Sequence, residues 1–253
     1  MTKRPIPEWF KLSEELTPLT HQRLAFALSN SILPVNVKFL PLQAHWHLLN
    51  TLQIANYANR KGMHANALSI TRQCIECISI IELGICGHSE APEMLARWND
   101  DNLTPGATRA WLEKNVWPHY GNGLWSESWS DYMAALSRSL QPFAHFSVLL
   151  SQWYGRFHEI KPKEDGGLEA IMEMGPMTYD SQKATRITLY HGLIHFTLAR
   201  IWCATVGMED RKFRAEIERL RIAIGASPYL DGEGTKWEQQ FWSMMWFRDG
   251  DPE

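Results

Sequence analysis

The sequence lacks the features that mark most secreted and membrane proteins. It has four cysteines in 253 residues, and three of them, Cys74, Cys77 and Cys86, fall in one apolar stretch, which is typical of reduced thiols packed in a core. No run approaches the roughly 18 uncharged apolar residues of a membrane span, and no apolar leader segment follows Met1. The sequence therefore predicts a cytoplasmic protein without a membrane partner.

Charge and motif content exclude further classes of function. The formal net charge is −3, so nucleic-acid binding would need a local basic patch, and we expect no recognition of DNA sequence. A glycine-rich phosphate loop, a nucleophile elbow and a dinucleotide-binding fingerprint are all missing, which leaves the common enzyme classes without support. No Glu-x-x-His occurs, which argues against a di-metal bundle. We expect neither a cofactor nor a metal.

Helical periodicity, in contrast, recurs along the chain, and strand alternation is hardly seen. Apolar spacing and capping signals predict helices over residues 7–31, 37–60, 64–86, 89–98, 105–117, 127–140, 142–156, 180–206, 208–224 and 236–247. Thr104, a capping residue followed by Pro105, marks one of these starts. Residues 161–178, rich in glycine and proline, form the most loop-like stretch. The fold class is therefore all-α: one domain over residues 1–253, a bundle of about nine to eleven helices with a long antiparallel hairpin.

Two charged residues interrupt the helix expected over residues 64–86, which is otherwise apolar almost all round. They are Arg72 and Glu76, four positions apart. Because lone buried charges are too costly to keep, we expect the two side chains to face each other or a partner. They form either a structural ion pair at a helix crossing or the lining of a polar pocket, and their exposure separates these alternatives.

Arg138 and His145 flank a proline-containing segment between two helix-patterned stretches. Their spacing satisfies the arginine-x(4 to 6)-histidine rule of one class of helical ribonucleases, so they are candidate catalytic residues. The alternative is a solvated arginine and a histidine satisfied in the core. Arg186 and His191 form the other such pair.

A second group of polar residues lies on the helix expected over residues 180–206. Arg186, Tyr190, His191 and His195 fall near one face, where they predict a binding site. His191 and His195 are four positions apart and could hold a metal, but two histidines are not a site, so we expect none. The tail over residues 237–247, rich in aromatic residues and methionine, must be covered by the bundle itself or by a second subunit or partner.

Several short motifs resemble those of a family. They are Arg72-x-x-x-Glu76 on the second helix of a long hairpin, Trp98 with Thr104-Pro105-Gly106, Tyr132 with Leu136-Ser137 and His145, and Gly175-Pro176 with Tyr179-Asp180. Together they look like the uncharacterised bacterial all-helical families grouped with the HEPN-like and abortive-infection proteins. The resemblance covers roughly residues 36–207, as a HEPN-like core, and leaves residues 208–253 as a C-terminal helical extension.

The resemblance implies a bundle that dimerises and acts through protein contacts in a phage-defence or toxin-antitoxin setting. It also implies an alternative, metal-independent cleavage of RNA. His145 would then handle protons for attack by the RNA 2′-hydroxyl, and Arg138 would stabilise charge on the phosphorane, with Arg72 and Glu76 as a supporting polar pair. Family members place a polar amide, acid or histidine after the arginine, where this chain has Ser139. A bundle that binds a metal or a small ligand is the third hypothesis.

Overall fold

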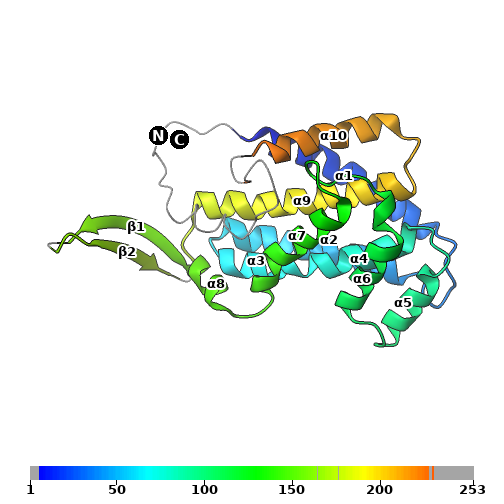
Figure 1. The fold of residues 1–253 in the computed structure, drawn as a ribbon, viewed down its shortest axis with the longest axis horizontal. Helices are drawn as coiled ribbons and strands as arrows, with labels where there is room; N and C mark the ends of the chain where they lie inside the picture. Colours follow the sequence, from blue (N-terminus) through cyan, green and yellow to red (C-terminus); the bar gives the residue numbers. More distant parts are fainter. Residues whose placement is uncertain (1–5, 164, 176, 228–229, 231–253) are drawn as a thin grey trace.

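The computed structural model describes residues 6–163, 165–175, 177–227 and 230 (Figure 1). Its helices are α1 (Glu8–Ser29), α2 (Leu40–Arg60), α3 (His64–Arg72), α4 (Cys74–Ile85), α5 (Ala91–Asn99), α6 (Pro105–Asn115), α7 (Trp129–Leu140), α8 (Val148–Ser151), α9 (Ser181–Thr205) and α10 (Arg211–Gly225). The strands β1 (Gly155–Pro162) and β2 (Leu168–Met174) form one small antiparallel sheet. The expected all-α class is confirmed.

α9 is the central helix of the bundle. It lies lengthwise between α1 and α10 on one side and α2, α3 and α4 on the other (Figure 1). Most of its residues are buried, because apolar side chains occur on all of its faces and each face meets another helix. One continuous set of buried apolar side chains, from Trp9 to Leu230, joins all ten labelled helices of the described part of the chain.

Side-chain caps mark the starts of two helices that the sequence predicted. At α6, the Thr104 hydroxyl accepts a hydrogen bond from the Ala107 N–H at 3.2 Å, with Pro105 as the first helical residue. At α9, the Asp180 carboxylate accepts hydrogen bonds from two backbone N–H groups of the first turn. These caps satisfy donors that have no partner within a helix. The helices expected over residues 7–31, 37–60, 89–98, 105–117, 127–140, 180–206 and 208–224 are confirmed with small shifts at their ends.

The long antiparallel hairpin of α2 with α3 and α4 differs in one detail from the expected single second helix. The helix over residues 64–86 is divided at Gln73 into α3 and α4, where the Gln73 N–H bonds to the carbonyl group three residues back. The hairpin turns at Gly62, whose φ of +77° favours glycine. Near the other end the helices approach closely, because a Cβ atom at Gly84 would lie 2.4 Å from the Pro41 Cβ.

Two expectations in the middle of the chain are wrong. Residues 142–156 do not form one helix: they contain only α8 and short 3-10 turns, and β1 begins at Gly155. The stretch over residues 161–178, expected as a loop, contains β2. The two strands pair from Gly155 with Met174 to Pro162 with Leu168, and the hairpin projects from the bundle (Figure 1). Glycine and proline residues in this stretch are typical of a loop, and no clear alternation of apolar and polar residues marks the two strands in the sequence.

The helix expected over residues 236–247, with its aromatic side chains, lies outside the described residues. Among the described residues, no helix combines the length and the apolar composition that crossing a membrane requires.

Candidate functional site

Two hollows adjoin where α4 faces its neighbours. The first, called here the apolar pocket, has a volume of ≈ 360 Å³ and lies between α2, α4, α5 and α6. Its defining residues are Leu40, Ala44, His47, Cys77, Ile80 and Trp98. The second, called the arginine groove, has a volume of ≈ 510 Å³ and lies between the α3–α4 junction, α6 and α7. Its defining residues are Arg72, Glu76, Arg109, Glu113, Arg138 and Gln141.

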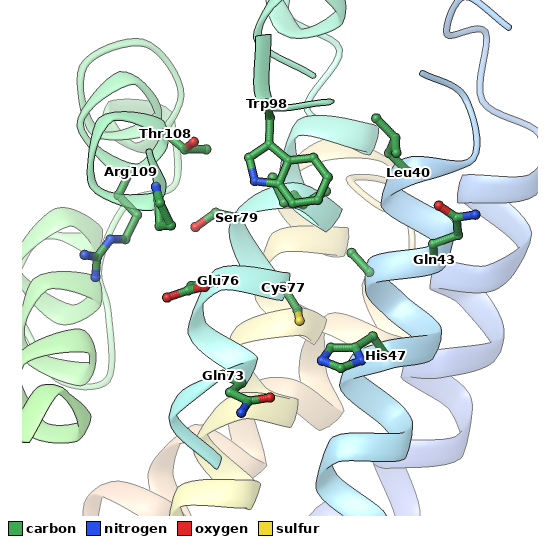
Figure 2. A pocket seen from close by; sticks show the side chains of 13 residues that line it. Leu40, Gln43, His47, Gln73, Glu76, Cys77, Ser79, Trp98, Thr108 and Arg109 are labelled. Carbon is green, nitrogen blue, oxygen red and sulfur yellow. The ribbon is translucent and has the colours of Figure 1, made fainter. Parts of the chain in front are cut away.

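Helical spacing places the walls of the apolar pocket. Ala44 follows Leu40 by four positions on α2, and Ile80 follows Cys77 by three on α4, so each pair lies on one face of its helix. Figure 2 shows the Trp98 ring, from α5, between α4 and the start of α2, with His47 and Cys77 toward the opposite end. Cys77 and Ile80 are buried, whereas His47 at the rim is exposed. The pocket therefore has an apolar floor and a polar rim.

The thiol in the pocket wall is not poised as a nucleophile. Burial, and then the charge of Glu76, raises the pKa of Cys77 to about 11. A thiol reacts as its thiolate, so at neutral pH Cys77 packs as a small apolar group.

Arg72 and Glu76 are in contact, as the sequence predicted. The Arg72 Nη1 donates to the Glu76 Oε1 at 3.0 Å. Its Nε and Nη2 donate to the Gln141 Oε1 at 3.2 and 3.1 Å. The Arg72 side chain is only 10% exposed, whereas that of Glu76 is 49% exposed. The pair is thus an ion pair that also lines a groove open to solvent, which combines the two alternatives.

Two further arginines face the same groove. Arg109, on α6, is half-buried, and its Nη1 donates to the Ser137 hydroxyl on α7. Burial, and then the nearby charge of Arg72, lowers the pKa of Arg109, while Glu76 opposes this shift. Arg138 is exposed at the end of α7. With Glu76 and Glu113, the groove holds three arginines against two glutamates, so its side chains favour an anion.

The structure places the other sequence-predicted residues elsewhere. His145 is exposed beyond the 3-10 turn over Gln141–Phe143, and it is not among the described residues that line the arginine groove. Arg186, Tyr190 and His191 are buried in α9, at 3%, 4% and 8% exposure. The predicted residues Arg72, Glu76 and Arg138 therefore lie together. His145 and the residues of α9 do not join them.

The predicted α9 residues form contacts within the core. The His191 Nε2 lies 2.9 Å from the Thr71 Oγ1. The Thr71 hydroxyl donates to the Ala67 carbonyl at 2.8 Å, so it accepts from His191, whose Nε2 carries the proton. The Arg186 guanidinium lies 5.8 Å from the centre of the Tyr190 ring. These contacts cross between α9 and α3 or follow α9 itself, as structural side chains do.

A chain of three histidines joins α1, α2 and α9. The His21 Nδ1 lies 2.9 Å from the His45 Nε2, and the His21 Nε2 lies 3.1 Å from the His195 Nδ1. His21 thus uses its two nitrogens on different partners, and they do not converge on one point. Among the described residues, no group of three or more histidine, cysteine or acidic side chains is arranged to hold a metal ion.

The histidine chain is held neutral. Burial is the largest cause of the lowered pKa at each ring, with values of about 2 for His21, about 4 for His45 and about 3 for His195. At His21, the charges that its two partners would carry add to the shift. A neutral imidazole donates through one nitrogen and accepts through the other, which a chain of rings requires.

Glu82 is a buried carboxyl group that the sequence argument missed. It is 0% exposed on α4, and the Trp117 indole Nε1 donates to both of its oxygens at 3.1 Å. Burial raises its pKa to about 7, although the Trp117 hydrogen bonds act in the opposite direction. A signal was present, because a lone acid in the apolar run from Ile78 to Ile85 invites the argument that applied to Arg72 and Glu76.

Comparisons of the chain with protein-family models, with curated proteins and with solved structures find no match. Function is therefore inferred from the residues of the site itself.

Proposed function

We propose that the protein binds a small organic ligand in the apolar pocket, as a ligand-binding helical bundle. The observation that carries this proposal is a hollow of ≈ 360 Å³, within the range of roughly 300–1,000 Å³ of small-molecule sites. An apolar hollow of this size between four helices therefore supports a binding role.

The distribution of polar groups supports the same role. Small-molecule sites combine an apolar lining with a few polar groups that fix the orientation of the ligand. Here Ser79 and Thr108 are buried in the wall, and Gln43, His47 and Gln73 lie exposed at the rim. A ligand would bury its apolar part against Trp98 and Ile80, with a gain of about 0.8 kcal/mol for each buried CH₂ group.

The test uses N-phenyl-1-naphthylamine, an uncharged probe whose fluorescence rises in apolar surroundings. We expect wild-type protein to bind it in the micromolar range, on the order of −8 kcal/mol. Ala44→Trp should fill the pocket from α2 and weaken binding by at least about tenfold, because the ring occupies the volume that the probe needs. Fluorescence titration gives the dissociation constants, and circular dichroism checks that the variants are folded.

The matched control is Gln53→Trp, which adds the same ring to an exposed position of α2 that does not line the pocket. It should bind the probe as the wild type does. His47→Trp, at the exposed rim, provides a second obstruction that does not alter the packed floor. If folded Ala44→Trp and His47→Trp both bind the probe with wild-type affinity, the apolar pocket is not the binding site.

Cleavage of RNA by a HEPN-like bundle is the second candidate function. The observation that favours it is that Arg138 lies in the same groove as Arg72 and Arg109, since guanidinium groups match the geometry of phosphate. In this proposal the bundle acts as a dimer in a defence or toxin-antitoxin setting, where a second subunit would complete the site around His145.

For this function, His145→Ala should abolish cleavage of single-stranded RNA in the presence of EDTA, because the proton carrier is removed. Arg138→Ala should reduce the rate by a factor of roughly 100 or more, as loss of a group that stabilises transition-state charge does. Arg211→Ala, an exposed arginine on α10, is the control and should cleave normally. Equal cleavage by wild type and His145→Ala would remove this candidate.

A further inference from the structure

The apolar pocket and the arginine groove adjoin and share part of their lining. Glu76, Pro105 and Arg109 line both hollows. Figure 2 shows the Arg109 guanidinium and the Glu76 carboxylate pointing to the side of α4 opposite His47. The contact from Arg109 to Ser137 places that guanidinium beside α7, in the groove. A molecule that fills the apolar pocket and extends past Pro105 therefore meets the charged side chains of the groove.

We infer that the ligand is an amphipathic anion, with its apolar part in the apolar pocket and its carboxylate or phosphate group in the arginine groove against Arg109 and Arg138. This inference rests on the proposed function, because it names the chemical class of the ligand that the pocket takes.

The hydrogen bonds of the groove leave two arginines able to receive such a group. Arg72 already donates through Nε, Nη1 and Nη2 to Glu76 and Gln141, so it serves to hold Glu76 in place. Arg109 donates through Nη1 to Ser137, and Arg138 is exposed at the mouth. Arginine binds carboxylate and phosphate groups through pairs of N–H donors.

The charges that face the groove favour an anion over a cation. The groove is lined by three arginines and two glutamates, an excess of one positive charge: Arg72, Arg109 and Arg138 with Glu76 and Glu113. The Glu76 carboxylate is already engaged by Arg72, so its repulsion of a bound anion is partly offset. Burial, and then like-charge repulsion from Arg72, lowers the pKa of Arg109. An anion beside Arg109 would relieve this repulsion.

The experiment compares ten-carbon ligands that differ only in their polar group. Decanoate, decyl phosphate and 1-decanol each compete for the site with N-phenyl-1-naphthylamine, whose displacement is followed by fluorescence. We expect decanoate or decyl phosphate to bind about tenfold more tightly than 1-decanol, as charge-assisted hydrogen bonds allow. The two anions are separate arms, and the stronger one identifies the group that the arginines receive.

Arginine variants locate the source of this preference. Arg138→Gln should reduce the preference for the anion over 1-decanol by several-fold, and Arg109→Gln combined with Arg138→Gln should remove this preference. Arg211→Gln, which removes one exposed arginine from α10, is the matched control and should retain the full preference. Because Arg138 is exposed, the single variant tests the inference even if loss of the Arg109 contact with Ser137 perturbs the fold.

The outcomes separate the two proposals. If the probe binds in the pocket and 1-decanol displaces it as well as the anions do, the proposed function stands and the inference about charge is wrong. If Arg211→Gln loses as much preference as Arg138→Gln, the effect is general electrostatics, and the inference is again wrong. If neither the probe nor any ten-carbon ligand binds, the proposed function itself fails.

Discussion

Acidification from pH 7 to pH 5 is expected to destabilise the protein strongly. Five histidines have pKa values well below the ordinary 6.5, with burial as the largest cause at each: about 2 for His21, about 4 for His45, His64 and His191, and about 3 for His195. They stay neutral in the folded state. The unfolded chain takes up a proton at each of them as the pH falls below 6.5.

The sign of the effect follows from this difference in bound protons. Between pH 6.5 and about pH 4 the unfolded state binds more protons, so the free energy of unfolding falls as the pH falls. At pH 5 a histidine that the fold holds neutral accounts for up to about 2 kcal/mol, and the five together account for several kcal/mol, with a smaller share from His64 because solvent screens it in part. This is a large fraction of the stability of a typical domain, roughly 5–15 kcal/mol. Glu82, whose pKa is raised, acts in the opposite direction: acidification from pH 7 to pH 5 increases its contribution to stability by only about 2 kcal/mol.

Urea denaturation at several pH values between 8 and 5 measures the effect. His191→Gln keeps a donor for Thr71 but cannot take up a proton, so it should reduce the slope of stability against pH by about 1.4 kcal/mol per pH unit below pH 6. His119→Gln, at an exposed position, is the control and should leave the slope unchanged. A free energy of unfolding that is flat from pH 7 to pH 5 would show that these histidines are not held neutral by the fold.

The second large effect is expected at Glu82. Burial raises its pKa from 4.5 to about 7, so its contribution to stability is complete below pH 4.5 and is lost as the pH rises through 7. The full loss corresponds to roughly 3 kcal/mol. Glu82→Gln keeps an oxygen that accepts from the Trp117 indole but cannot ionise. Between pH 5 and pH 9 the variant should therefore gain roughly 3 kcal/mol relative to the wild type.

Comparing the free energies of unfolding of the variant and wild type across pH separates the effect of ionising the Glu82 carboxyl group from the effect of packing an amide in its place. Any cost of burying the amide N–H groups, about 1–3 kcal/mol, applies at every pH and cancels in the difference. Glu14→Gln, on the exposed side of α1, is the matched control and should show no relative gain. If the free energies of unfolding of Glu82→Gln and wild type change in parallel from pH 5 to pH 9, Glu82 is ionised in the folded state throughout, and its environment is polar.

The helices were predictable where residues within or next to the helix determine its position. Thr104 with Pro105, and Asp180 before α9, cap helices through local hydrogen bonds, so their signals lie within a few residues. The apolar spacing along each helix is local in the same sense. The β1–β2 hairpin, which projects from the bundle (Figure 1), was missed because glycine and proline residues over 161–178 are typical of a loop and no clear alternation marks its strands.

The candidate site was only partly predictable. Arg72 and Glu76 were found because two charges four residues apart on an apolar helix imply a contact, and Glu82 could have been found by the same reasoning. Arg109 and Trp98 come to the site from α6 and α5, and only the packing of those helices against α4 brings them there. The contacts among His21, His45 and His195 likewise join three helices. The spacing of residues within one helix does not predict contacts of this kind.

The most direct test of the proposed binding site is a crystal structure of the protein with decanoate. We expect the alkyl chain to lie in the apolar pocket, against Trp98 and Ile80, with the carboxylate within hydrogen-bond distance of Arg109 or Arg138. Decanoate bound on another face of the protein, or a crystal structure in which the apolar pocket is closed by the side chains that line it, would contradict this expectation.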